Sequence, residues 1–501
     1  MSKKMRLIFT PVFFALILAF VSCLANAQTF ETIKSKVKVH SLANGMKFIV
    51  LERHEAPVVA FHVYADVGSA NESYGITGIS HILEHMAFKG TTTVGTKDYT
   101  AESKVLDEID SVYDEMKREE AKPQPDSARV AELKTRFEDL QKKAKEYVVN
   151  NEYFDMMMRQ GDRGVNAYTN TDATQYINSL PGNKLEFWMA MTSDRFLNPV
   201  FREFFKERDV IMEERRLGLE TRPQGKLMED FMAVAFKAHP YHHEVVGHMS
   251  DLQSINRRDV EEYFKKFYGP SNLTVGIVGD VMPEEVFKLA EEYFARIPSG
   301  PKPAPVRTVE PEQWGERRVT VAAQAQPMVL VGYHVPDARH KDSPACDALA
   351  NILAQGRSSR LYQVLVKDKK TAVATQGFYG FPGDKFPNLV AFVLVPAAGR
   401  SSAECLDLFE QEVEKIKKDS VSEEELQKYK RGSIKGILNQ MKSNSTMAAQ
   451  LTYADVVLGD WQKIFDQVKE INAVTADDVR RVASAYLIKT NRTIGEIVQG
   501  N

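Results

Sequence analysis

A pattern in the middle of the chain returns near its end, and this repeat constrains the fold more than any other feature. The matching positions are Asp259, Val260, Asn272, Thr274 and Gly276 in the first copy and Asp478, Val479, Asn491, Thr493 and Gly495 in the second. Each pair is separated by 219 residues. In both copies a helical pattern precedes a β-rich run. The chain is therefore predicted to contain two related α+β domains.

We expect these domains at residues 35–296 and 312–496, joined by a Pro-rich linker at 297–311. Each domain is predicted to be a mostly antiparallel β-sheet packed with helices. A chain of 501 residues with 43% hydrophobic residues is long and apolar enough for two cores. A charge-rich stretch at 103–149 predicts a helical hairpin inserted in the first domain, with a largely solvated surface.

The first 27 residues have the pattern of a secretory signal peptide. Basic residues precede an apolar run at 7–24, and Ala25-Asn26-Ala27 is typical of a cleavage site. We expect cleavage after Ala27, export to the periplasm and no integral membrane span in the processed protein. Two alternatives stay open, namely an uncleaved anchor and lipid attachment at Cys23.

The charge and cysteine content exclude several protein classes. A formal net charge of −3 gives no attraction to nucleic acid or to an anionic membrane. Only Cys346 and Cys405 would remain after processing, so the mature protein is not a disulfide scaffold. The sequence leaves open whether these two cysteines pair.

The segment from His81 to His85 carries the clearest chemical signal. On a helix, two histidines at i and i+4 lie on one face and can bind one metal ion. Glu84 lies beside them and can accept a proton from water. The order H-x-x-E-H is the inverted form of the commoner H-E-x-x-H zinc motif. Ser80 is the expected N-cap of this helix. The alternative is a chance pairing of two of the 11 histidines.

Two histidines do not complete a zinc site, so a third protein ligand is expected elsewhere. In the segment 206–220, predicted as a helix, Glu207 and Glu214 are two turns apart and share a face. Glu213 points about 100° away from Glu214 and cannot share that role. Without the histidine pair, this segment would be taken for a solvated charged helix.

These motifs together resemble the pitrilysin/insulinase family of zinc peptidases, in the short form of mitochondrial processing peptidase and its bacterial relatives. The resemblance covers roughly residues 35–495. It implies that the chain is one half of a clam-shell peptidase with one zinc ion per chain. The implied roles are zinc binding for His81, His85 and Glu214, general base for Glu84, supporting carboxylate for Glu207, and substrate binding by the edge strand at Asn166 and Ala167.

Two departures from the family pattern matter. The separation of 129 positions from His85 to Glu214 exceeds the usual spacing, and the hairpin at 103–149 accounts for the excess. After Ser358–Leu361, relatives carry an Arg and a Tyr that help to hold the substrate and its oxyanion, whereas this chain has Val366 and Val373. We therefore expect a heterodimer with a second family member that supplies the Arg/Tyr pair. The alternative is a homodimer in which Arg360, Tyr362 or Lys367 substitutes.

The resemblance implies a zinc-dependent endopeptidase that cleaves unfolded peptides in an exported compartment. One alternative is a non-catalytic scaffold subunit of a peptidase-like complex, but a scaffold has no need for the full set of motif residues. A metal-binding or storage protein is a third hypothesis, which would leave Glu84 without a purpose.

Overall fold

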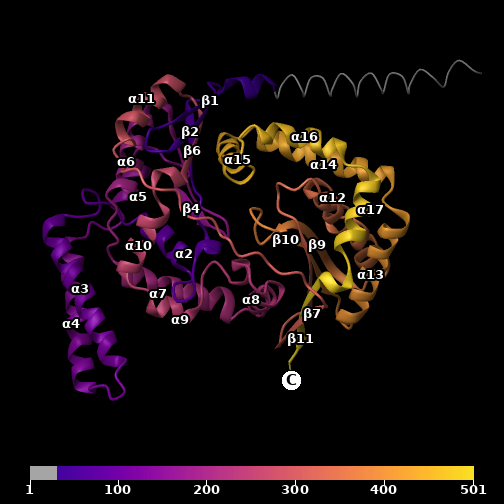
Figure 1. The fold of residues 1–501 in the computed structure, drawn as a ribbon, viewed down its shortest axis with the longest axis horizontal. Coiled ribbons are helices and arrows are strands. Elements are labelled where there is room, and N and C mark those ends of the chain that lie inside the picture. The colour runs from indigo at the N-terminus through magenta and orange to yellow at the C-terminus, as the bar shows by residue number, and fades with distance from the viewer. Residues whose placement is uncertain (1–30, 501) are drawn as a thin grey trace, which may run out of the picture.

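The computed structural model describes residues 31–500, which form two lobes that follow each other along the chain (Figure 1). The predicted signal peptide and its alternative lipid site at Cys23 lie outside these residues. Within 31–500, none of the helices combines the length and the apolar character needed to cross a membrane.

The first lobe contains a six-stranded sheet in the order β1-β2-β6-β3-β5-β4. Its strands are β1 (Val37–Ser41), β2 (Lys47–Glu52), β3 (Val58–Ala65), β4 (Asn166–Thr169), β5 (Thr174–Pro181) and β6 (Leu273–Gly279). All neighbours are antiparallel except β2 and β6. The Asn-Gly turn between β1 and β2 places Gly45 at φ +95°, a conformation that glycine adopts without strain.

The second lobe repeats this topology with five strands in the order β7-β11-β8-β10-β9. The strands are β7 (Arg317–Ala323), β8 (Met328–Val335), β9 (Ala372–Phe381), β10 (Asn388–Pro396) and β11 (Arg492–Gln499). The pair β7–β11 is parallel and the other pairs are antiparallel. The five strands β2-β6-β3-β5-β4 of the first sheet have the same pattern, because β2–β6 is their only parallel pair. The predicted class, two related and mostly antiparallel sheets packed with helices, is confirmed.

The repeat seen in the sequence has a physical basis. Helix α10 (Arg257–Phe267) precedes β6 as α17 (Ala476–Tyr486) precedes β11. Asn272 donates its side-chain N–H to the carbonyl of the last residue of α10 at 2.9 Å, and Asn491 does the same for α17 at 2.9 Å. Each asparagine thus fixes the turn from helix to strand, because it satisfies a carbonyl that the helix end leaves free.

Two helices cross between the lobes in a reciprocal way. Helix α8 (Pro223–Ala235) packs on β7 and β11 of the second sheet, and α15 (Asn444–Val457) packs on β3 and β6 of the first. In Figure 1, α15 lies between the two lobes. The repeated glycines allow this approach: a Cβ at Gly276 would lie 2.7 Å from a carbonyl of α15, and one at Gly495 would lie 3.0 Å from side chains of α8. The division at 297–311, which contains no helix or strand, stays a proposal, because each half covers the other's sheet.

Twelve further α-helices complete the two lobes of residues 31–500. They are α2 (Ile79–Met86), α3 (Tyr99–Glu120), α4 (Ser127–Tyr147), α5 (Glu152–Arg159), α6 (Leu185–Leu197), α7 (Phe204–Arg215), α9 (Met249–Ser254), α11 (Pro283–Tyr293), α12 (Ser343–Ala354), α13 (Ser402–Asp419), α14 (Glu423–Gln440) and α16 (Lys463–Ala473). Cys346 on α12 and Cys405 on α13 are buried free thiols.

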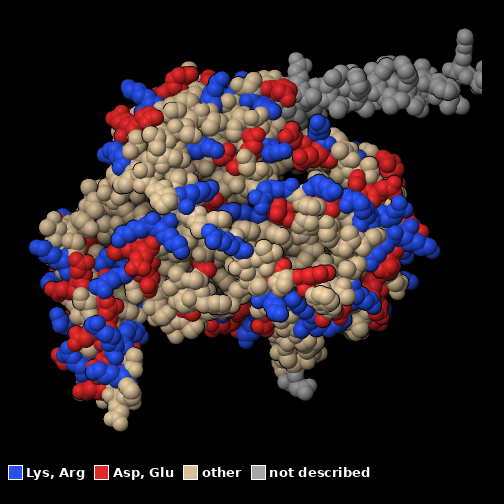
Figure 2. Space-filling model, in the orientation of Figure 1, with Lys and Arg blue, Asp and Glu red and all other residues tan. Residues whose placement is uncertain are grey.

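Helices α3 and α4 form a hairpin that projects from the first lobe and carries charges of both signs (Figures 1 and 2). The expectation of a largely solvated insertion is right only for the tip. Toward its base, α3 buries a row of apolar side chains in the main core of the first lobe. Tyr113 packs on Phe205 of α7 with ring centroids 4.7 Å apart, and Phe137 of α4 does so at 4.8 Å. Sequence reasoning underestimated this contact because charged residues outnumber the buried ones.

Two deletions are expected to behave differently. Removing the tip, residues 118–131, should leave the free energy of unfolding nearly unchanged, because most of these side chains are exposed. Removing 105–147 should lower it by more than about 5 kcal/mol, since several buried side chains are lost and Phe205 is uncovered. Denaturant unfolding of both variants measures this; equal stabilities would contradict the packing described here.

Buried carboxylates connect the lobes next to β4. Asp172, in the turn between β4 and β5, accepts the backbone N–H of Asp384 at 2.8 Å and of Lys385 at 3.0 Å. Asp384 accepts the hydroxyl of Tyr453, on α15, at 3.0 Å. Burial raises the pKa of Asp384 to about 6, against the opposing hydrogen bond from Tyr453.

This shift predicts a pH dependence of stability. The folded state holds the proton on Asp384 more tightly than the unfolded state, whose aspartate has a pKa near 4. The contribution of protonated Asp384 to the stability of the folded state is therefore complete below about pH 4 and is lost as the pH rises through about 6. The free energy of unfolding in urea should be compared for wild type and Asp384→Asn. As the pH falls from 7.5 to 4, wild type should become more stable relative to the variant by up to roughly 3 kcal/mol. A difference that stays constant over this range would refute the assignment.

Candidate active site

Helix α2, which carries the two histidines, is held at its N-terminus by a buried carboxylate. Glu72 accepts the backbone N–H groups of Gly78 and Ser80, each at 2.8 Å. The N-cap is Gly78, at φ +91°. A Cβ there would lie 2.5 Å from the carbonyl oxygen of Val246, so only glycine fits. The prediction that Ser80 is the N-cap is wrong: Ser80 lies in the first turn, with its hydroxyl 2.8 Å from that of Tyr263.

The structure brings three candidate metal ligands together. The Nε2 atoms of His81 and His85 lie 3.8 and 4.0 Å from one carboxylate oxygen of Glu214. All three donors lie within 4.8 Å of one another. A tetrahedral zinc ion with bonds of about 2.0–2.1 Å needs donors roughly 3.3 Å apart, so a small contraction would suffice. Two imidazoles and one carboxylate are also a ligand set typical of catalytic zinc.

Burial keeps His81 ready to bind a metal. It lowers the pKa of His81 to about 4, helped by the nearby His85, so the imidazole is neutral at pH 7. Burial would also lower the pKa of His85, but Glu207 and the charges of Glu214 and Glu84 outweigh it and raise that pKa. A metal ion therefore competes with a proton that His85 holds more tightly than an ordinary histidine does.

Glu207 supports His85 from two turns before Glu214 on α7. Its carboxylate lies 3.5 Å from Nδ1 of His85, which favours the tautomer that leaves Nε2 free as a ligand. The interaction with His85 holds the pKa of Glu207 at about 2, against burial and with help from Lys89. Lys89 makes an ion pair with Glu207 and a second one, at 3.3 Å, with Glu203.

Glu84 lies beside the donors and belongs to the same turn as His85. Its carboxylate accepts the hydroxyl of Thr169, on β4, at 2.6 Å. Burial raises the pKa of Glu84, although the hydrogen bond from Thr169 opposes the shift. A carboxylate with a raised pKa is better matched to proton transfer near neutral pH.

Helix α7 ends differently from the prediction. The sequence predicts an α-helix over 206–220. The α-helical part ends at Arg215, and the chain then forms one wider π-helical turn, Arg216–Glu220. Glu213 points away from the histidines and pairs with Arg216 at 3.1 Å. π-turns occur often at functional sites, and this one places Gly218 in the wall of the pocket at Glu214.

The pocket also borders the edge strand β4. Ala167, Tyr168 and Thr169 line it together with His81 and Glu84. β4 pairs with β5 on one side only and is the last strand of its sheet. Asn166, at the start of β4, is exposed and does not line the pocket.

Sequence reasoning missed three residues that hold the site, namely Glu72, Lys89 and Thr169. Glu72 and Lys89 flank the histidine motif, and Thr169 ends the strand that begins at Asn166. Each lies within or next to a motif segment, but a polar side chain there indicates no partner until the fold is known.

The fold is that of one half of a clam-shell peptidase, and it carries the inverted histidine motif. Residues 47–113 match the family "Insulinase (Peptidase family M16)", and residues 254–433 match "Peptidase M16 inactive domain". The chain belongs to this pitrilysin/insulinase family. The first match contains His81, Glu84 and His85, and the second contains most of the half without this motif.

Individual relatives agree with this assignment. The chain is 28% identical to the zinc protease PqqE of Helicobacter pylori over 465 residues, which cover 90% of each chain. A crystal structure of a protease from Helicobacter pylori superposes with a TM-score of 0.76 at 25% identity, over 92% of this chain and 99% of that one. The periplasmic protease PqqL from Escherichia coli has the same fold (TM-score 0.69, 17% identity), over 93% of this chain and 48% of PqqL.

Proposed function

We propose that this chain is a zinc-dependent endopeptidase, with one zinc ion held by His81, His85 and Glu214. The convergence of these three donors beside Glu84 carries the proposal. The name of the relative PqqE, a zinc protease, supports the choice of metal. Bound zinc would polarise the scissile carbonyl and lower the pKa of the attacking water.

The chain's own residues carry the proton. Glu84 accepts it from the attacking water and delivers it to the leaving amine, which its raised pKa favours. Thr169 holds the carboxylate in place through its hydroxyl. Glu207 and Lys89 orient His85, and Glu72 anchors the helix that carries both histidines.

The substrate in this proposal is an unfolded peptide. An extended peptide can add to the free edge of β4 through main-chain hydrogen bonds, with Asn166 and Ala167 as the first contacts. Folded proteins rarely present such a strand. The periplasmic location of PqqL supports export of this chain as well.

The proposed enzyme works as a heterodimer. PqqL is about twice as long as the segment matched here, which supports pairing of two such halves. Val366 and Val373 cannot donate a hydrogen bond from their side chains. Arg360 is not free to replace the missing Arg, because Glu425 binds its guanidinium at 2.6 and 2.8 Å. A partner with the Arg/Tyr pair would complete the site.

Co-expression tests the heterodimer. A family member that carries the Arg/Tyr pair is expected to raise kcat/KM of the purified chain by about 10²–10³, the usual effect of an oxyanion donor. A version of that partner with both residues changed to Val is the control. Full activity of the chain alone, unchanged by either partner, would refute the heterodimer.

Zinc content and cleavage of an internally quenched peptide distinguish the proposed enzyme from its alternatives. The enzyme is expected to bind one equivalent of zinc and to lose cleavage when a chelator removes it. Zinc without cleavage, even with the partner present, would favour the storage protein. A chain that neither binds zinc nor cleaves the peptide would favour the scaffold subunit. The match of residues 254–433 to an inactive domain is consistent with that alternative.

A further inference from the structure

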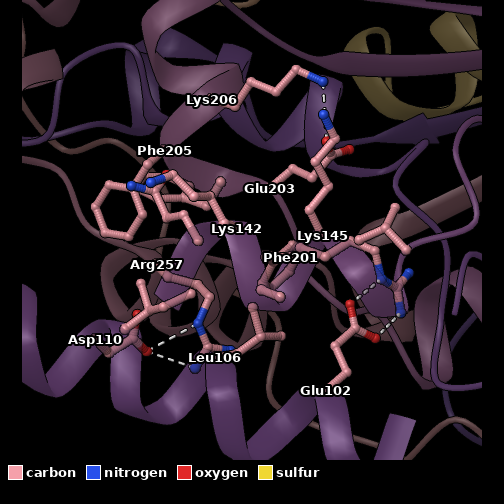
Figure 3. A pocket seen from close by; sticks show the side chains of 16 residues that line it. Glu102, Leu106, Asp110, Lys142, Lys145, Phe201, Glu203, Phe205, Lys206 and Arg257 are labelled. Carbon is pink, nitrogen blue, oxygen red and sulfur yellow. Dashed lines mark hydrogen bonds and ion pairs between the residues drawn. The ribbon is translucent and has the colours of Figure 1, made fainter. Parts of the chain in front are cut away.

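A cavity of about 220 Å³ lies where the base of the α3–α4 hairpin meets α7 (Figure 3). Its apolar lining consists of Leu106 and Ile109 of α3, Val148 after α4, Phe201 before α7 and Phe205 in α7. Each of these side chains is buried. An interior of this kind favours an alkyl chain over a polar ligand, because water in it finds few partners.

The two arginines in the wall are paired with buried carboxylates. Arg202 binds Glu102 at 2.9 Å, and both side chains are almost completely buried. Arg257 binds Asp110 at 2.6 Å on the opposite side of the cavity (Figure 3). Because each buried charge has its counter-charge, the interior does not require a charged ligand group.

The mouth of the cavity is basic. The exposed members of the lining are Lys142, Lys145 and Lys206. Lys206 pairs with Glu203 at 3.0 Å, and Lys142 pairs with the exposed Asp139 at 2.9 Å. Within residues 31–500, Lys145 has neither an ion pair nor a side-chain hydrogen bond. One cation at the mouth is therefore free to bind an anion.

We propose that this cavity binds a medium-chain aliphatic carboxylate, with its alkyl tail among the apolar side chains and its carboxylate on Lys145. Lys206 can add a second contact to the carboxylate. Its present partner Glu203 also pairs with Lys89, so Glu203 keeps one counter-charge if Lys206 turns to the ligand. The ammonium group of a lysine and a carboxylate form a charge-assisted hydrogen bond. Burial of the tail supplies the larger part of the affinity.

The site is separate from the donors of the metal site. None of the cavity's lining residues is His81, His85 or Glu214. Carboxylate binding requires no metal, so it can be measured on chelated protein, and a failure of the proposed peptidase activity would not affect it.

Isothermal titration of decanoate below its micellar concentration tests the proposal. Wild type is expected to bind one equivalent, and decanol and decyltrimethylammonium should bind at least about tenfold more weakly. Lys145→Glu should weaken decanoate binding by a similar factor. Lys143→Glu is the matched control, because Lys143 is an exposed neighbour on α4 outside the cavity.

A second variant tests the position of the tail. Ala144→Leu extends a side chain of the lining into the cavity and should reduce decanoate binding at least tenfold, with circular dichroism as the check on folding. The absence of decanoate binding to wild type would overturn the proposal. So would equal binding of decanol, or equal losses in Lys145→Glu and Lys143→Glu.

Discussion

Glu84→Gln is expected to retain zinc and to lose peptide hydrolysis by about 10²-fold or more. Glutamine keeps the shape of the side chain and can still bind the hydroxyl of Thr169, but it cannot accept a proton from water. The variant should therefore fold and bind metal like wild type. The measurement is kcat/KM on a quenched peptide, with zinc content determined on the same sample.

Thr169→Val is a useful companion to this variant. It removes the hydroxyl that holds Glu84 without touching the carboxylate, so activity should fall less than in Glu84→Gln. That hydrogen bond lowers the pKa of Glu84. Its loss should therefore raise this pKa and shift the acid limb of the pH–rate profile to higher pH. Near-normal turnover by zinc-loaded Glu84→Gln would refute the role of Glu84 as general base.

Glu214→Gln is expected to lower zinc affinity by at least about 100-fold, whereas Glu213→Gln should leave it unchanged. The two residues are neighbours on α7 with similar exposure, but only Glu214 has an oxygen near both histidine Nε2 atoms. Glu213 instead pairs with Arg216 on the outer side of the helix. Competition with a chromophoric zinc chelator measures both affinities.

Loss of zinc from Glu213→Gln would mean that the end of α7 is rotated in solution. Equal retention by both variants would mean that Glu214 is not a ligand. In the first case Glu213 would be the third donor, and in the second the histidine pair would need a donor other than Glu214.

The sequence predicted what depends on local periodicity. The spacing of His81 and His85 places them on one helix face, and the seven-residue spacing of Glu207 and Glu214 does the same. The repeat at a separation of 219 residues predicted two related halves, because the same helix-to-strand turn recurs at Asn272 and Asn491.

Features that depend on packing between distant segments were not predictable in the same way. Nothing in α8 or α15 indicates that each covers the sheet of the other half, although the repeated glycines mark where they approach. The role of Glu72 requires the loop before α2 to fold back on its N-terminus. The buried face of α3 was hidden by the charged residues that surround it.

The location of the metal tests the central claim most directly. A crystal of the zinc-loaded chain, measured on both sides of the zinc absorption edge, is expected to show one anomalous peak between the Nε2 atoms of His81 and His85 and the carboxylate of Glu214. The bond lengths should be about 2.0–2.2 Å. A peak elsewhere in the chain, or a fully loaded chain without a peak at these three side chains, would contradict the account.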